Sequence, residues 1–308
     1  LTKKITTPPF NGVAGGIIAF NVSGHFDFNG NTIHGSSRGF RGGYSPKNDS
    51  GGNNATTYVG EAKVKSISGK GEGIAGTPKF MWDGFNEVVN LDEGMPGGSS
   101  GRGAPANAGG GGNDHNSGGG GGGNGGYGGL GGYGWQGGGG AQWTSTNPLT
   151  GGGRPGYLSF RTPDPELTRL IMGGGGGAGD ANDAKDGVKG GVGGAIVLIN
   201  AGTVKGPGTI EVNGGAGAAG VYQNSSDGAG GAGAGGTVLL NISGATTNGI
   251  ITISADGGDG GNTANDTKNE HGPGGGGGGG IIRHNIADAS VTTSAKGGAA
   301  GLTNGNGV

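Results

Sequence analysis

Apolar residues cluster in short runs that recur along the second half of the chain. The runs begin at Gly193, Gly235 and Gly279, so their starts are 42 and 44 residues apart. Each run opens with two glycines and continues with β-branched or leucine residues. A nearly fixed period of this size is typical of stacked repeats. We therefore predict three tandem repeats over residues 173–308.

Each predicted repeat consists of a strand, a turn, a second strand and a glycine tract. The first strand is apolar at adjacent positions, as in Ile196–Ile199, which is typical of strands that are covered on both faces. The second strand alternates, with Ile210 and Val212 on its covered face. Gly and Asn bound these segments, as they commonly bound strands.

The same pattern occurs once near the N-terminus, over Gly15–Gly30. We take residues 1–34 as a first copy, which leaves residues 35–172 as an irregular insertion rich in glycine and aromatic residues. Within it, residues 61–67 alternate like a half-exposed strand, and residues 79–91 concentrate large apolar side chains into a predicted local core. The chain as a whole is predicted to form one elongated domain, residues 1–308.

Glycine makes up 90 of the 308 residues, against about 7% in an ordinary protein. Collagen is excluded, because these glycines occur in runs and the chain has only 12 prolines. The tracts could be flexible linkers. They could also be rods with three residues per turn whose backbones bond to one another. The main tracts are Gly109–Gly112, Gly118–Gly123, Gly137–Gly140, Gly173–Gly177 and Gly274–Gly280.

Most of these tracts adjoin a predicted strand, which favours packed rods over linkers. The sequence thus predicts an all-β fold: a repeat-built, β-solenoid-like or sandwich-like stack of short strands with packed polyglycine-II tracts. No segment has a convincing helical period.

Composition and charge exclude several classes of function. The chain has no cysteine, so disulfides and thiolate chemistry are excluded. A net charge of −2 offers no field that would attract nucleic acid or an anionic membrane. No run approaches the ~20 apolar residues of a membrane-inserted helix. The low charge, the many Asn, Thr and Ser residues and the start at Leu1 lead us to expect a secreted, cell-surface protein with a processed N-terminus.

Catalytic motifs are not apparent. The five histidines show neither metal-ligand spacing nor a nucleophile–base arrangement, and no Gly-x-Ser-x-Gly elbow occurs. The glycine tracts are not followed by the Lys-Ser/Thr of a phosphate-binding loop. We expect a protein that is not an enzyme.

Calcium is the one cofactor that the sequence leaves open. Hard cations bind several oxygen ligands, which Asp and Asn supply. The same residues are also common in turns for conformational reasons. The candidate ligands form two clusters: Asp180, Asn182, Asp183 and Asp186, and then Asp256, Asp259 and Asp266.

Large aromatic residues gather around the glycine-rich part of the insertion. They are candidates for binding a glycan or receptor, because an aromatic ring beside hydrogen-bonding groups suits such ligands. They could instead cap the ends of glycine rods, where they would hide apolar surface. The residues are Tyr127, Tyr133, Trp135, Trp143 and Tyr157.

The first ten residues have the chemistry of an extended chain, since Pro8 and Pro9 favour β or polyproline-II conformations. No local hairpin partner is evident. We expect this segment, with Leu1, Thr2, Ile5 and Phe10, to add a strand to a neighbouring subunit or module, so that copies form a homo-polymer. A frayed terminus is the alternative.

The phrase from Gly15 to Gly30, its continuation to Gly43, and the tandem copies ending at Gly215 and Gly258 resemble a glycine-rich module of large secreted bacterial surface proteins, among them adhesins of gliding and predatory bacteria. A more distant likeness is to phage tail-fibre-tip adhesins with a polyglycine sandwich. The resemblance implies a non-enzymatic structural or adhesive component of a surface filament or adhesin. A receptor- or glycan-binding tip module is the alternative, and an ice-binding protein is the third.

Overall fold

The computed structural model describes residues 1–45, 57–61, 67–90, 94–95, 97–134, 151–159, 169–181, 188–222, 225–244, 246–247, 249–263 and 271–303. The all-β prediction is confirmed: apart from one short 3₁₀ turn, Asp288–Ser290, the elements of these residues are strands. No helix in the described ranges has the length and apolar composition needed to cross a bilayer.

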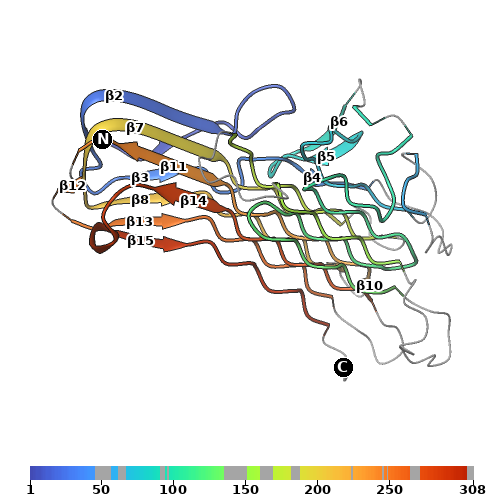
Figure 1. Cartoon of the computed structure of the whole chain (residues 1–308). Helices are drawn as coiled ribbons and strands as arrows, with labels where there is room; N and C mark the ends of the chain where they lie inside the picture. The colour runs from blue at the N-terminus through green and yellow to red at the C-terminus, as the bar shows by residue number, and fades with distance from the viewer. Residues whose placement is uncertain are drawn as a thin grey trace.

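Two parallel sheets face each other at one end of the molecule (Figure 1). One has the order β2 (Ile17–Asp27), β7 (Ile196–Lys205), β11 (Thr237–Ile242) and β14 (Ile281–His284), with β12 (Thr246–Thr247) on the end of β7. The other has the order β1 (Ile5–Thr6), β3 (Thr32–His34), β8 (Gly208–Glu211), β13 (Ile251–Ser254) and β15 (Val291–Ser294).

The paired strands follow chain order, because β2, β7, β11 and β14 are neighbours in one sheet and β3, β8, β13 and β15 in the other, with β1 and β12 as additional short strands. Their equivalent apolar positions are in register: Ile18 pairs with Val197, Val197 with Val238, and Val238 with Ile282. These side chains and those of the second strands, such as Ile210, form the main apolar core between the sheets. The predicted covering of both faces holds for β11, whereas Ile17 in β2 is 55% exposed.

Two small antiparallel units complete the described strands. One contains β4 (Gly42–Gly43), β5 (Phe80–Trp82) and β6 (Glu87–Val89), and the other pairs β9 (Val221–Tyr222) with β10 (Ser225–Ser226). The predicted local core over residues 79–91 is only partly right. Phe80 and Met81 are buried, but Phe85 at the hairpin turn is 61% exposed. Most of the predicted strand at residues 61–67 lies outside the described residues.

Beyond the sandwich, the chain continues as extended glycine-rich segments that run side by side (Figure 1). We call these segments rods. Rod 228–236 lies among six others, and its hydrogen bonds follow a period of three. Its successive N–H groups donate in turn to rods 172–181, 272–280 and 212–220, and its carbonyls accept from rods 117–124, 188–195 and 255–263.

Glycine is required in the inner rods because of the close approach of their backbones. A Cβ on Gly274 would lie 1.8 Å from the carbonyl oxygen of Gly230, and one on Gly231 would lie 2.1 Å from that of Gly120. Neither glycine has a positive φ, so an L-residue could adopt the backbone conformation itself. The constraint is therefore steric rather than conformational.

Adjacent glycines of rod 295–302 offer a matched test. A Cβ on Gly298 would lie 1.9 Å from the carbonyl oxygen of Gly258, whereas one on the exposed Gly297 would meet its nearest atom at 3.6 Å. We expect Gly298→Ala to lower the free energy of unfolding by about 1–3 kcal/mol through overpacking. Gly297→Ala should be neutral or stabilise by up to about 1 kcal/mol, because it restricts only the unfolded chain.

Urea titrations measure both effects, provided that the m-values of the variants equal that of the wild type. Gly276→Ala and Gly120→Ala extend the test to deeper rods, where each Cβ would lie 2.2 Å from a carbonyl oxygen. Equal stabilities of the Gly297→Ala and Gly298→Ala variants would show that the rods do not pack as described.

Candidate functional site

Rod 126–134 has room for side chains at only one residue in three. A Cβ on Gly128 or Gly131 would lie 2.1 or 2.2 Å from a carbonyl oxygen of rod 117–124. A Cβ on Gly132 would lie 2.2 Å from Pro273 in rod 272–280. Cβ atoms on Gly129 and Gly134 would lie 2.9 and 2.2 Å from backbone atoms of Gly276 and His115. The side chains that the rod carries, spaced by three, are Tyr127, Leu130 and Tyr133.

Rod 151–157 lies beside it and has glycines at its closest approaches, although Pro155 follows Arg154 directly. The N–H groups of Gly128 and Gly131 donate to carbonyls of Gly156 and Gly153, at 3.0 and 2.9 Å, so the two rods are antiparallel. Cβ atoms on Gly153 and Gly156 would lie 2.0 and 2.3 Å from carbonyl oxygens of rod 107–113. The larger side chains of this rod, Arg154 and Tyr157, are again three residues apart.

Together these side chains form a surface feature that we call the tyrosine stripe: Tyr127, Leu130, Tyr133, Arg154 and Tyr157. Tyr127 and Tyr157 are 61% and 58% exposed, and Tyr133 is half-buried. The rings of Tyr127 and Tyr157 lie 6.2 Å apart between centroids and are inclined by 72°. The rings of Tyr127 and Tyr157 are thus mostly in contact with solvent. Trp135 and Trp143 lie outside the described residues.

Arg154 gives the stripe a positive charge, whereas the nearby Arg102 is buried. The Arg154 side chain donates a hydrogen bond to the Tyr58 hydroxyl at 3.0 Å. Its guanidinium carbon and that of Arg102 lie 5.6 and 5.2 Å from the Tyr58 ring centroid. The hydrogen bond from Arg154, with the nearby charges, lowers the pKa of Tyr58, and burial lowers the pKa of Arg102. Sequence reasoning missed both arginines, although the spacing of three between residues 154 and 157 was visible.

The predicted calcium ligands are not gathered into one described site. Asp256 Oδ1 accepts from the backbone N–H of Lys296 at 2.7 Å, and Asp259 Oδ1 accepts from that of Ala299 at 2.8 Å. Asp180 is buried in another rod, where its Oδ2 accepts from the N–H of Asn116 at 3.0 Å. The described ranges contain no group of three or more His, Asp or Glu side chains placed to hold a metal ion. Asn182, Asp183, Asp186 and Asp266 lie outside those ranges.

The acidic residues belong to a ladder that connects successive repeats. Ser36 Oγ accepts from the N–H of Asn213 at 3.0 Å, and Asn213 Oδ1 accepts from that of Asp256 at 2.8 Å. Asp256 then accepts from Lys296, which has no acceptor atom on its side chain. Hydrogen bonding between repeats thus accounts for the position of Asp256. The sequence signal for this role is that Asn213 and Asp256 occupy equivalent positions in successive repeats.

The N-terminal segment does not extend away from its own chain as expected. In β1, Ile5 and Thr6 pair with Ile33 and His34 of β3, parallel and within the same chain. The side chains of Leu1 and Ile5 pack against the main core, and the Phe10 ring contacts that of Phe40 at 5.7 Å. The local partner was missed because β3 is parallel and follows more than 25 residues later, so no hairpin signal marks the pair.

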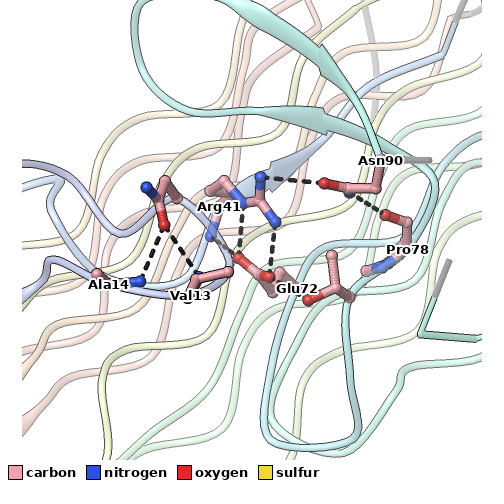
Figure 2. A network of polar contacts seen from close by, with 8 residues as sticks. Val13, Ala14, Arg41, Glu72, Pro78 and Asn90 are labelled. Carbon is pink, nitrogen blue, oxygen red and sulfur yellow. Dashed lines mark hydrogen bonds and ion pairs between the residues drawn. The ribbon is translucent and has the colours of Figure 1, made fainter. Parts of the chain in front are cut away.

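A buried ion pair connects Arg41, at the start of the insertion, to Glu72 further along it (Figure 2). Arg41 Nε and Nη2 each lie 2.9 Å from a carboxylate oxygen of Glu72, and both side chains are 1% exposed. The carboxylate also accepts from the Arg41 N–H at 3.1 Å and from the Thr77 hydroxyl at 2.6 Å. Asn90 donates to the Pro78 carbonyl at 2.6 Å and contacts Arg41.

Comparisons with known proteins provide no relative for this chain. No family model, no curated protein and no solved structure matches it. The resemblance to bacterial surface modules therefore stays an expectation.

Removing one partner of the buried Arg41–Glu72 pair should destabilise the folded protein. We expect Arg41→Met to lower the free energy of unfolding by about 3–5 kcal/mol, because it leaves the Glu72 carboxylate buried without its cation. The double variant Arg41→Met/Glu72→Met should recover much of this loss, since both charges are removed together. Urea unfolding of the two variants measures the difference. A double variant less stable than Arg41→Met would contradict the electrostatic explanation.

The lowered pKa of the buried Lys70 side chain should make the stability of the fold depend on pH. The side chain is 3% exposed, and burial lowers its pKa from 10.5 to about 8. Between these values the unfolded chain binds a proton that the folded chain does not, so this group makes stability rise from about pH 8 to pH 10.5. The Lys70→Met variant should lack that part of the rise. The comparison of urea midpoints for both proteins at pH 7.5 and 10 isolates it, and parallel curves would contradict it.

Proposed function

We propose that the chain is a non-enzymatic adhesive module of the cell surface, in which the rods serve as a rigid scaffold for binding side chains. The observation that carries this proposal is the hydrogen bonding of rod 228–236 to six neighbours. A rod held in this way cannot bend or shift by itself, so side chains on the outer rods keep a fixed spacing. Such preorganisation lowers the entropic cost of binding.

The chemistry of the last repeat favours an adhesive module over a subunit that polymerises by strand addition. Open strand edges pair with other chains unless charges block them. In β14, Arg283 and His284 occupy the positions that Leu239 and Leu240 have in β11. In rod 295–302, Lys296 follows Ser36, Asn213 and Asp256 in the ladder between repeats. Its side chain has no acceptor atom, so it cannot accept an N–H group from a further copy.

The N-terminus supports the same choice. Ile5 and Thr6 of β1 pair with β3 of their own chain, so that segment is part of its own sheet and does not reach over to a neighbouring copy. The proposal therefore places function on the surface of the rods, and the extracellular location follows from the low charge and the resemblance described above.

Adhesion can be measured with beads that carry the folded protein through its N-terminus. The beads are passed in buffer flow over films of polysaccharide, protein and phospholipid. We expect firm retention on at least one film. Beads carrying the same protein after irreversible heat unfolding should be retained less, because the spacing of the side chains is lost. Equal retention of both preparations on all films would overturn the proposal.

A further inference from the structure

We propose that the tyrosine stripe binds an extended polysaccharide chain that lies along rods 126–134 and 151–157. The inference rests on the adhesive function proposed above and names its ligand class. It starts from the exposed rings of Tyr127 and Tyr157 and from the three-residue spacing of the side chains on both rods.

The spacing of the stripe suits a polymer with a regular repeat. A rod with three residues per turn and a rise of about 3.1 Å per residue places successive side chains of one face about 9 Å apart. Tyr127, Leu130 and Tyr133 are such positions. This distance is close to the length of two sugar rings in an extended chain, so one polysaccharide can meet the same surface chemistry repeatedly.

The chemistry of tyrosine matches that of a sugar. The ring presents an apolar face and the hydroxyl a polar tip, while a pyranose has an apolar C–H face and a rim of hydroxyls. Because the rings of Tyr127 and Tyr157 are inclined by 72°, a flat sugar stacks on one of them and meets the edge of the other. Two neighbouring sugars can therefore use both rings.

Arg154 adds a charge preference at a defined place in the stripe. The two hydrogen bonds between the rods put Arg154 level with Leu130, between Tyr127 and Tyr133. Its guanidinium, held by the Tyr58 hydroxyl, can donate to sugar hydroxyls and pairs well with a carboxylate. The stripe should therefore accept neutral chains and bind chains of uronic acids more tightly at low salt.

The size of the stripe argues against a protein as the ligand. A stable protein–protein interface uses about 20–30 residues on each side. The stripe has five side chains, and the positions between them on rod 126–134 are glycines whose backbone is occupied by the neighbouring rods. A narrow row of rings on a rigid backbone fits a linear chain better than a second globular surface.

Affinity electrophoresis of the whole protein tests the inference, with hydroxyethylcellulose as the neutral chain and alginate as the acidic one. We expect both polymers to retard the protein. The variant Tyr127→Ala/Tyr157→Ala should weaken both affinities by about tenfold or more, as is usual for truncating central aromatic contacts. Phe85→Ala is the matched control, because Phe85 is equally exposed at 61% but lies at the hairpin turn after β5.

Two further variants sharpen the assignment. Arg154→Gln should weaken binding of alginate and leave that of hydroxyethylcellulose within about twofold, since it removes only the charge-assisted contact. Leu130→Tyr should strengthen binding of both polymers, because it completes the row of rings. Sedimentation of the wild type and the double tyrosine variant at equal concentrations then tests whether the stripe mediates self-association.

Three results would overturn the inference: no retardation by either polymer, unchanged retardation of the double tyrosine variant, or a wild-type dimer that the tyrosine substitutions dissociate. The adhesive function would survive the first two if the beads still bound a protein or lipid film. Loss of bead retention on every film would instead contradict the adhesive function itself.

Discussion

The fold depends on backbones that approach too closely for a side chain at most of their glycine positions. Only small side chains fit inside rod 228–236, where Ala229, Ala232 and Ala234 are fully buried. Within the rods, a Cβ would lie about 2 Å from a neighbouring carbonyl oxygen at Gly231, Gly274 and Gly298 alike. Glycine loses the most conformational entropy on folding. Here that loss is offset by hydrogen bonds to neighbours in several directions and by close contacts along the whole rod. The apolar core between the two sheets is correspondingly confined to one end of the molecule.

The same constraint decides where chemistry can occur. Large side chains are excluded where a rod approaches its neighbours most closely, so on rod 126–134 they occur at a spacing of three. Tyr127 and Tyr133 follow this rule on one surface, and Asp256 and Asp259 follow it beside rod 295–302, where their carboxylates accept backbone N–H groups. One geometry thus produces an exposed aromatic row in one place and a structural ladder in another.

The insertion is part of this lattice. Rod 117–124, which comes from residues 35–172, donates hydrogen bonds to rod 228–236 of the tandem repeats. The buried Arg41–Glu72 pair connects two segments of the insertion itself. Rod 126–134, which carries part of the stripe, donates hydrogen bonds to Gly276 and Pro273 of rod 272–280 in the tandem repeats. The stripe therefore rests on rods that are bonded to the repeats.

The sequence alone determined the all-β class, because it follows from local patterns of apolar residues such as Ile196–Ile199, and the same patterns led us to predict the repeat. It also identified Tyr127 and Tyr157 as candidates, since large side chains are conspicuous among glycines. Only the tertiary structure decided which rods are neighbours, that Asp256 accepts a hydrogen bond from the next repeat, and that Ile5 pairs with Ile33 of its own chain. Rods bond to segments distant in the chain, and a run of glycines carries no side chain to specify its partner.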